Sequence, residues 1–196
     1  MSAIDKFAWA ALSSRATVQS SYDIARIAII NSVPGDFVEC GVFAGSQCAA
    51  MARAIMDHRH MAGARKVHLF DSFAGIPAAD PEDVDWPHSA GTSACTLKQV
   101  QQYMDDWGID KSLLCYHPGW FENTVHQNIF CFEHIAVLRL DADLYESTKI
   151  CLKHLYPRLS IGGWLIVDDM NLAGCRKAIN EFFADTLPPI YFQVHP

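Results

Sequence analysis

Short apolar runs alternate along the chain with segments in which apolar residues recur at helical spacing. The runs are nearly continuous, as in strands of a parallel sheet that is covered on both faces. Strands are predicted at 37–41, 66–71, 113–116, 135–141, 164–167 and 190–194. Helices are predicted at 46–58, 97–107, 144–159 and 177–183, with one or two more within 3–31, and Gly162 and Gly163 are expected to end the third of these helices.

This alternation predicts the fold class, because parallel neighbouring strands need crossover helices. We expect an α/β fold with a doubly wound, mostly parallel sheet in three α/β/α layers, similar to the Rossmann architecture. Residues 1–196 are predicted to form one domain, with a short helical region at 1–33 and the core at 34–196. In such sheets ligands bind outside the carboxyl ends of the strands, where the strand order reverses.

Composition excludes several classes of protein. The 196 residues carry 15 Lys and Arg against 22 Asp and Glu, a net charge of −7, and no basic cluster that could hold nucleic acid. No run of about 18 apolar residues predicts a membrane span. The seven cysteines form no CxxC pair and are expected to be reduced thiols that bind no zinc. A cytoplasmic enzyme or binding protein is therefore expected.

A glycine turn follows the first predicted strand. Gly41 and Gly45 lie four residues apart, so the spacing differs from the GxGxxG pattern that holds a pyrophosphate. A cofactor without pyrophosphate fits better, and S-adenosylmethionine carries an ammonium and a sulfonium that favour a carboxylate such as Glu39. The alternative is an ordinary turn between strand and helix.

Acidic residues end three more of the predicted strands. Asp71 is placed to accept hydrogen bonds from a ribose, with Phe73 covering the adenosine, unless Asp71 caps the next turn and Phe73 belongs to the core. Asp141, Asp168 and Asp169, together with Asp143, would repel one another at one edge of the sheet unless a cation compensates. Magnesium prefers such ligands, although Asp143 or Asp169 could instead cap a helix that begins there.

The segment 75–96 has several prolines and no regular pattern, which indicates either a lid over the substrate or a surface excursion. Trp86, Trp107, Trp120 and Phe121 could form an aromatic wall for an acceptor, or they could be local core.

Taken together, the segments resemble the macrocin O-methyltransferase family in order and spacing over roughly residues 34–183. The resemblance rests on Gly35 to Ser46, Phe70 to Pro77, Gly119 to Thr124, Leu138 to Thr148, Leu155 to Gly163 and Val167 to Asp169.

The resemblance implies a class I methyltransferase fold that uses S-adenosylmethionine and Mg²⁺ to methylate a hydroxyl of a small molecule, often an antibiotic sugar. It assigns to the cofactor site Glu39, Cys40, Gly41, Gly45, Ser46, Asp71, Ser72, Phe73 and Trp120. It also implies that Asp141, Asp168 and Asp169 hold the metal. Asp141 is the expected general base, with Asp143 as the alternative for both of its roles.

The chain departs from the family pattern at both ends. The region before residue 34 leaves little length for a helical lid, and the last strand of the fold is either missing, supplied by a partner or removed. A homo-oligomer is left open. The competing interpretations are a nucleotide-dependent oxidoreductase on a similar sheet and a degenerate methyltransferase that only binds its cofactor.

Overall fold

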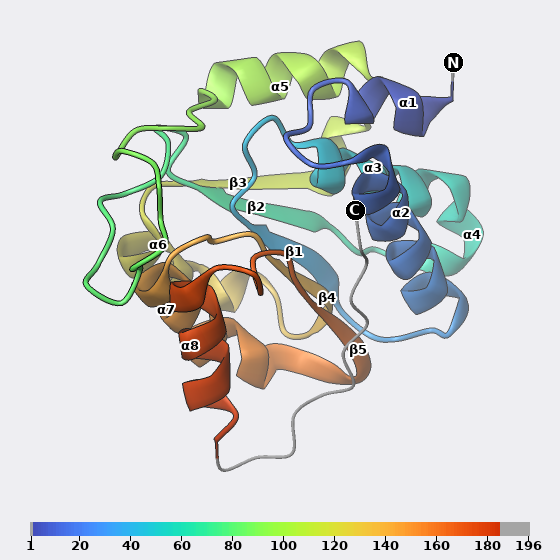
Figure 1. Ribbon diagram of the computed structural model, residues 1–196. Coiled ribbons are helices and arrows are strands. Elements are labelled where there is room, and N and C mark those ends of the chain that lie inside the picture. The colour runs from blue at the N-terminus through green and yellow to red at the C-terminus, as the bar shows by residue number, and fades with distance from the viewer. Residues whose placement is uncertain (1, 185–196) are drawn as a thin grey trace.

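A computed structural model of the protein describes residues 2–184. Five parallel strands form one sheet in the order β3-β2-β1-β4-β5 (Figure 1). The strands are β1 (Asp36–Cys40), β2 (Val67–Asp71), β3 (Leu114–Pro118), β4 (Ile135–Leu140) and β5 (Leu159–Val167). The order confirms the predicted doubly wound sheet, and it reverses between β1 and β4, which makes the carboxyl ends of these two strands the expected ligand site.

Helices cover both faces of the sheet. One face carries α1 (Ala3–Ala8), α2 (Arg15–Ile30), α3 (Ser46–Asp57), α4 (Arg59–Ala62) and α5 (Leu97–Asp106). The other carries α6 (Phe121–Asn128), α7 (Tyr145–Leu155) and α8 (Ala173–Phe182). None of the described helices is both long and apolar enough to cross a membrane.

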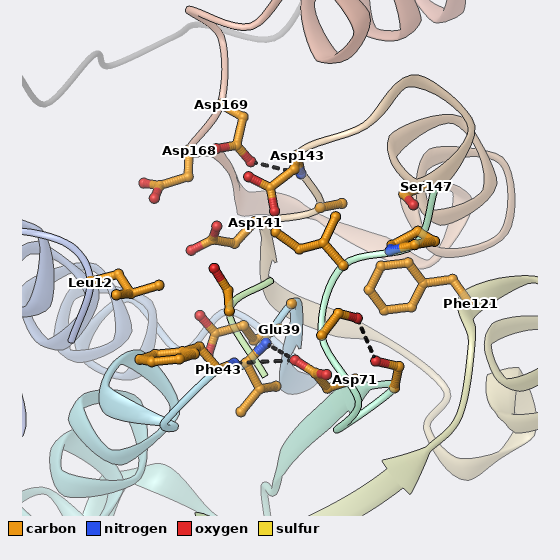
Figure 2. A pocket seen from close by; sticks show the side chains of 18 of the residues that line it. Leu12, Glu39, Phe43, Asp71, Phe121, Asp141, Asp143, Ser147, Asp168 and Asp169 are labelled. Atoms are coloured by element: carbon orange, nitrogen blue, oxygen red, sulfur yellow. Dashed lines mark hydrogen bonds between the residues drawn. The ribbon is translucent and has the colours of Figure 1, made fainter. Parts of the chain in front are cut away.

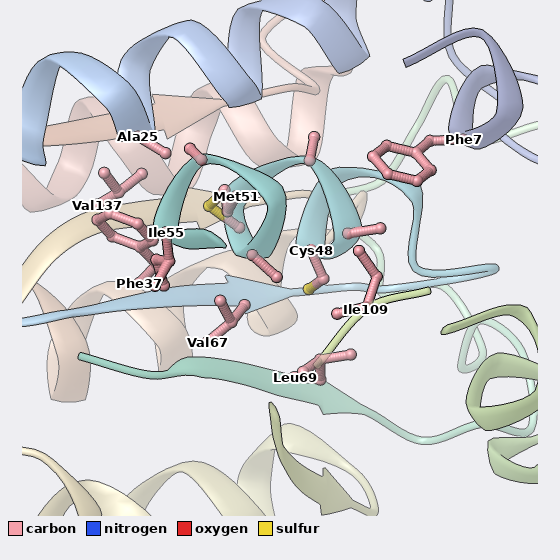
Figure 3. Close-up of a cluster of buried hydrophobic side chains, with 14 of the residues drawn as sticks. Phe7, Ala25, Phe37, Cys48, Met51, Ile55, Val67, Leu69, Ile109 and Val137 are labelled. Carbon is pink, nitrogen blue, oxygen red and sulfur yellow. The ribbon is translucent and has the colours of Figure 1, made fainter. Parts of the chain in front are cut away.

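Alternating strand residues feed two hydrophobic cores. In β1, Phe37 packs with the α3 side and Val38 with the α7 side, as expected when successive side chains point to opposite faces. Figure 3 shows Met51 and Ile55 of α3 beside Phe37. Both cores are therefore continuous with the sheet, which explains the nearly unbroken apolar runs in the sequence.

The glycine pair at 162–163 was wrongly assigned to the end of a helix. Helix α7 ends at Leu155, two residues before Pro157, which has no N–H for an α-helical hydrogen bond and lies in a short 3-10 turn. Both glycines lie inside β5, where the pairing with β4 shifts register between Ile135 and Val137. A Cβ on Gly163 would lie 2.8 Å from the carbonyl oxygen of Ser160, so this irregular strand segment requires glycine.

Two other elements differ from the prediction. Helix α8 begins at Ala173 rather than at 177, and α6 was not predicted. The segment 75–96 has no helix or strand, as its sequence predicts. The strand predicted at 190–194 lies outside the described residues.

Candidate active site

A cavity of about 430 Å³ opens at the carboxyl edge of the sheet, over the ends of β1 and β4. Figure 2 shows Asp141, Asp143, Asp168 and Asp169 gathered along one side of it. Its wall also includes parts of the N-terminal segment, of the 75–96 loop and of the turns before α6 and α8. The structure therefore has a cavity at the carboxyl ends of the strands, where the sequence predicts that a ligand binds.

The wall of the cavity is strongly acidic. Seven carboxylates line it: Glu39, Asp71, Glu122, Asp141, Asp143, Asp168 and Asp169. No lysine or arginine is among the described residues that line it. Such a wall favours a cationic ligand over a phosphate-bearing one, because each phosphate would face several like charges.

Arg139 of β4 lies beneath this wall and binds three of the acids. Its Nε donates to Oε1 of Glu39 over 3.0 Å, and its Nη2 lies 3.0 Å from Oδ2 of Asp141 and 2.9 Å from Oδ1 of Asp168. Burial alone would lower the pKa of Arg139, but the three carboxylates outweigh it and the pKa is raised. Arg139 therefore stays charged and fixes these carboxylates in place.

Glu39 is held from two sides. Besides Arg139, the thiol of Cys48 in α3 donates to Oε2 of Glu39 over 2.7 Å. Burial raises the pKa of Glu39 to about 7, while Arg139 and Cys48 act in the opposite direction. Glu39 nevertheless lines the cavity, at the position predicted from the strand end.

Three of the acids converge closely enough to share a metal ion. One carboxylate oxygen from each of Asp141, Asp143 and Asp169 lies within 4.8 Å of the others. Burial, followed by repulsion between the carboxylates, raises the pKa of Asp143 and of Asp169 to about 7. Burial also raises the pKa of Asp141 well above its ordinary value, against the lowering effect of Arg139.

This donor set fits a hard divalent cation such as Mg²⁺, which would relieve the repulsion. The predicted ligands Asp141, Asp168 and Asp169 all reach the same edge. The convergent three, however, include Asp143 in place of Asp168, whose carboxylate pairs with Arg139.

Asp71 organises the glycine turn. Its Oδ2 accepts hydrogen bonds from the N–H groups of Val42 at 2.6 Å and Phe43 at 3.1 Å, and its Oδ1 accepts from Phe73 at 2.7 Å. Asp71 and Ser72 line the cavity. The hydrogen bond from Phe73 shows that Asp71 does cap the turn that follows it, which was the alternative considered from the sequence.

Backbone conformation favours glycine at both positions of the turn, since Gly41 and Gly45 each have a φ of +86°, and packing against backbone also requires it at Gly41. A Cβ on Gly41, at φ +86°, would lie 1.6 Å from the carbonyl oxygen of Asp141. A Cβ on Gly45 would lie 2.5 Å from Cε of Met104 in α5. Gly41 therefore lets the ends of β1 and β4 approach each other, which brings Glu39 near the aspartates that follow β4.

The N-terminal segment reaches the cavity despite its short length. Ser46 donates from its hydroxyl to the carbonyl of Phe7 at 2.8 Å, and the side chain of Gln47 donates to the hydroxyl of Ser13 at 2.8 Å. Leu12 lines the cavity and is 71% exposed. These bonds hold residues 11–13 over one side of the site.

The remaining predicted residues divide into two groups. Trp120 lines the cavity, whereas Cys40 and Phe73 are buried in the cores and are not among the described lining residues, nor is Gly45. Sequence reasoning missed several lining residues, including Gln47, Ser147 and Asn171. No sequence pattern marked them, because Gln47 and Ser147 lie in the first turns of α3 and α7 and Asn171 lies in the turn before α8, and only folding brings these segments together.

Comparisons with known proteins agree with this geometry. The macrocin O-methyltransferase (TylF) family profile matches residues 7–187. The chain is 38% identical over 161 residues to 8-demethyl-8-(2,3-dimethoxy-alpha-L-rhamnosyl)-tetracenomycin-C 4'-O-methyltransferase of Streptomyces olivaceus, covering 79% of this chain and 60% of that protein. It is 35% identical over 170 residues to mycinamicin III 3''-O-methyltransferase of Micromonospora griseorubida, covering 79% of this chain and 63% of that protein. The chain thus spans about three fifths of the length of these relatives.

Solved structures show the same fold. The O-methyltransferase NovP superimposes with a TM-score of 0.77 at 32% identity, over 89% of this chain and 74% of that chain. The calicheamicin methyltransferase CalS11 superimposes with a TM-score of 0.72 at 23% identity, over 85% of this chain and 70% of that chain. The profile match over most of the chain shows that this protein belongs to the macrocin O-methyltransferase (TylF) family, and its parallel five-stranded sheet and the superposition on NovP show the class I methyltransferase fold.

Proposed function

We propose that the protein is an S-adenosylmethionine- and Mg²⁺-dependent O-methyltransferase that methylates a hydroxyl on the sugar of a secondary metabolite. Family membership and relatives named as O-methyltransferases support the reaction, and the rhamnosyl group in the name of one relative supports the acceptor class. The acidic cavity supports the donor and the metal.

The observation that carries the proposal is the charge of the cavity wall. Seven carboxylates and no described lysine or arginine suit a sulfonium, an ammonium and a divalent cation, all of which are positive. A nicotinamide dinucleotide brings two phosphates instead. The same wall would repel them, which counts against an oxidoreductase.

The turn after β1 would hold the donor. Glu39, Gly41 and Ser46 line the cavity on the side where we propose the methionine part lies, and Asp71 and Ser72 line it where we propose the ribose lies. Glu39 and Asp71 already accept hydrogen bonds from the protein, so their carboxylates are held in place before S-adenosylmethionine binds. Trp120 completes this proposed subsite.

Asp141, Asp168 and Asp169 are the proposed metal residues, with Asp143 added by its place in the convergent cluster. When bound, S-adenosylmethionine supplies an electrophilic methyl group and Mg²⁺ acidifies an acceptor hydroxyl. The chain's own part is to position both reactants, exclude water and accept the hydroxyl proton.

The proton acceptor is one of two carboxylates. Asp141 directly follows β4, as expected for the general base, but its Oδ2 accepts a hydrogen bond from Arg139. The carboxylate of Asp143 accepts no hydrogen bond from another described residue. This freedom favours Asp143 as the base and Asp141 as a metal ligand.

Calorimetry and turnover test the proposal. S-adenosylhomocysteine should bind the wild type and Asp141→Asn with dissociation constants within about twofold, because Asp141 lies in the metal cluster. Methyl transfer from S-adenosylmethionine to mycinamicin III, the acceptor in the name of one relative, should be lost in Asp141→Asn and in excess chelator. Full turnover under either condition would refute the metal-dependent mechanism.

Three further outcomes separate the alternatives. If Asp143 is the base and not a metal ligand, Asp143→Asn should abolish turnover but retain Mg²⁺ binding, whereas loss of Mg²⁺ binding in this variant would assign Asp143 to the metal and leave Asp141 as the base. Binding of S-adenosylhomocysteine without turnover of any acceptor would favour a degenerate cofactor-binding protein. Binding of a nicotinamide dinucleotide in place of S-adenosylhomocysteine would favour the oxidoreductase.

A further inference from the structure

Two acids in the loop between β2 and α5 accept hydrogen bonds from the helices α7 and α8 beside the cavity. Asp83 is only 7% exposed, and its Oδ1 accepts a hydrogen bond from the N–H of Tyr145 over 2.8 Å. The carboxylate of Asp85 accepts from the N–H of Ala173, 3.0 Å from each oxygen. Tyr145 and Ala173 are the first residues of α7 and α8.

These two contacts replace caps that the helices lack. The residues at the N-cap positions of α7 and α8 are Leu144 and Leu172, whose side chains cannot accept a hydrogen bond from the first turn. Carboxylates at those positions also meet the positive end of each helix dipole. The loop thus binds to the starts of two helices, immediately after the turns that carry the acid cluster.

The fit of Asp83 is close. A Cβ on Gly174 in α8 would lie 1.8 Å from Oδ1 of Asp83, so only glycine leaves room for the carboxylate at this point. The carboxylate has a second bond, because its Oδ2 accepts from the N–H of Asp80 over 2.9 Å. The loop position is therefore defined by packing as well as by hydrogen bonds.

This anchoring brings Trp86 and His88 to the cavity wall. Both residues line the cavity, and their rings lie 5.0 Å apart at 75°. The N–H of the Trp86 backbone donates to the carbonyl of Asp83 over 3.1 Å, which ties the indole to the anchor.

The indole N–H of Trp86 is the unusual group. Its Nε1 is buried and has no hydrogen-bond partner among the described residues, and it is the one such buried side-chain atom that belongs to a residue of the cavity wall. A buried donor without an acceptor is costly, so an acceptor is expected to arrive with a ligand.

We propose that Trp86 is a specificity-determining residue whose indole N–H donates a hydrogen bond to an oxygen of the acceptor sugar, and that Asp83 and Asp85 hold it in position. The inference rests on the proposed function and deepens it. An indole offers a donor and an apolar face together, and a sugar ring presents oxygens beside apolar C–H groups.

Indole N–H signals in a ¹H–¹⁵N spectrum test this directly. The protein has five tryptophans, and Trp86→Phe and Trp107→Phe identify two of the signals. The probe is methyl α-L-rhamnopyranoside, added to the protein with S-adenosylhomocysteine present. The Trp86 signal should move downfield and saturate. The Trp107 signal should stay, since its ring packs between Phe7 and Tyr103 at 5.3 and 5.4 Å.

Affinity gives the second readout. Saturation-transfer difference spectra should show Trp86→Phe binding the rhamnoside about tenfold more weakly, as for one lost hydrogen bond. Calorimetry should show S-adenosylhomocysteine binding within about twofold of the wild type. A Trp86 signal that does not respond to the rhamnoside, or equal rhamnoside affinity in Trp86→Phe, would overturn the inference. Failure of S-adenosylhomocysteine to bind the wild type would instead count against the proposed function.

Discussion

The guanidinium of Arg139 donates a hydrogen bond over 3.0 Å to the carboxylate of Glu39, and neither side chain is more than 2% exposed. The pair joins β4 to β1, the two strands between which the strand order reverses. The same guanidinium also pairs with Asp168 and with Asp141, which is one of the three converging aspartates. One buried cation therefore links both halves of the proposed site.

Replacing this cation should destabilise the fold strongly. Arg139→Met leaves Glu39 buried beside two further acids without a counter-charge, and we expect a loss of about 3–5 kcal/mol in the free energy of unfolding. Urea denaturation at pH 7.5 measures it. The control is Lys111→Met, whose exposed pair with Asp105 should contribute about 1 kcal/mol or less. Equal effects of the two substitutions would show that the buried network is not important for stability.

Two aspartates of the same site should respond in opposite directions. Asp143→Asn removes a charge from a cluster that repels itself, so without metal the protein should gain about 1 kcal/mol of stability. Asp168→Asn weakens a 2.9 Å pair with Arg139 and should lose about 1–3 kcal/mol. Urea denaturation in the presence of a chelator measures both changes. Destabilisation by Asp143→Asn would contradict the repulsion argument.

The loop anchor should contribute a helix cap. Asp85→Ala removes the acceptor for the first N–H of α8, and we expect a loss of about 1 kcal/mol. Limited proteolysis should also cut faster within 75–96, because the loop loses one of its two anchors. The matched control is Glu133→Ala, a side chain that is 89% exposed, which should stay within about 0.5 kcal/mol of the wild type. An unchanged cleavage rate in Asp85→Ala would argue against anchoring.

A buried histidine pair predicts how stability depends on pH. His117 of β3 lies 2.9 Å from His68 of β2, which also contacts Asp36 at 3.1 Å. Burial, and then the charge of His68, lower the pKa of His117 to about 4 from 6.5, against the raising effect of a hydrogen bond with Asn128.

Because the unfolded chain takes up this proton more readily, the contribution of His117 is complete above about pH 6.5 and falls as the pH drops toward 4. Between pH 7.5 and pH 5, we expect the free energy of unfolding to fall by about 2 kcal/mol more in the wild type than in His117→Gln. Urea denaturation of both proteins at pH 7.5 and at pH 5 measures these changes in the free energy of unfolding. Parallel pH profiles would mean that folding does not lower the pKa of His117.

The sequence was sufficient for the strands that build the sheet. Runs such as 135–140 are buried on both faces, so their hydrophobicity is nearly continuous and does not depend on which neighbours they meet. It also placed acids at the ends of β1, β2, β4 and β5, because a residue that ends a strand is a local property. The carboxyl ends of parallel strands share one edge, so Glu39, Asp71, Asp141 and Asp168 had to lie near one another.

Only the tertiary structure decided which of these acids pair and which stay free. Arg139 binds Glu39, Asp141 and Asp168, while Asp143 joins the convergent cluster, and these choices depend on distances between residues far apart in the chain. The anchoring of the 75–96 loop has the same origin, since the helix starts that need caps lie more than 60 residues away. Local pattern determines the elements, whereas contacts between distant segments determine the chemistry of the site.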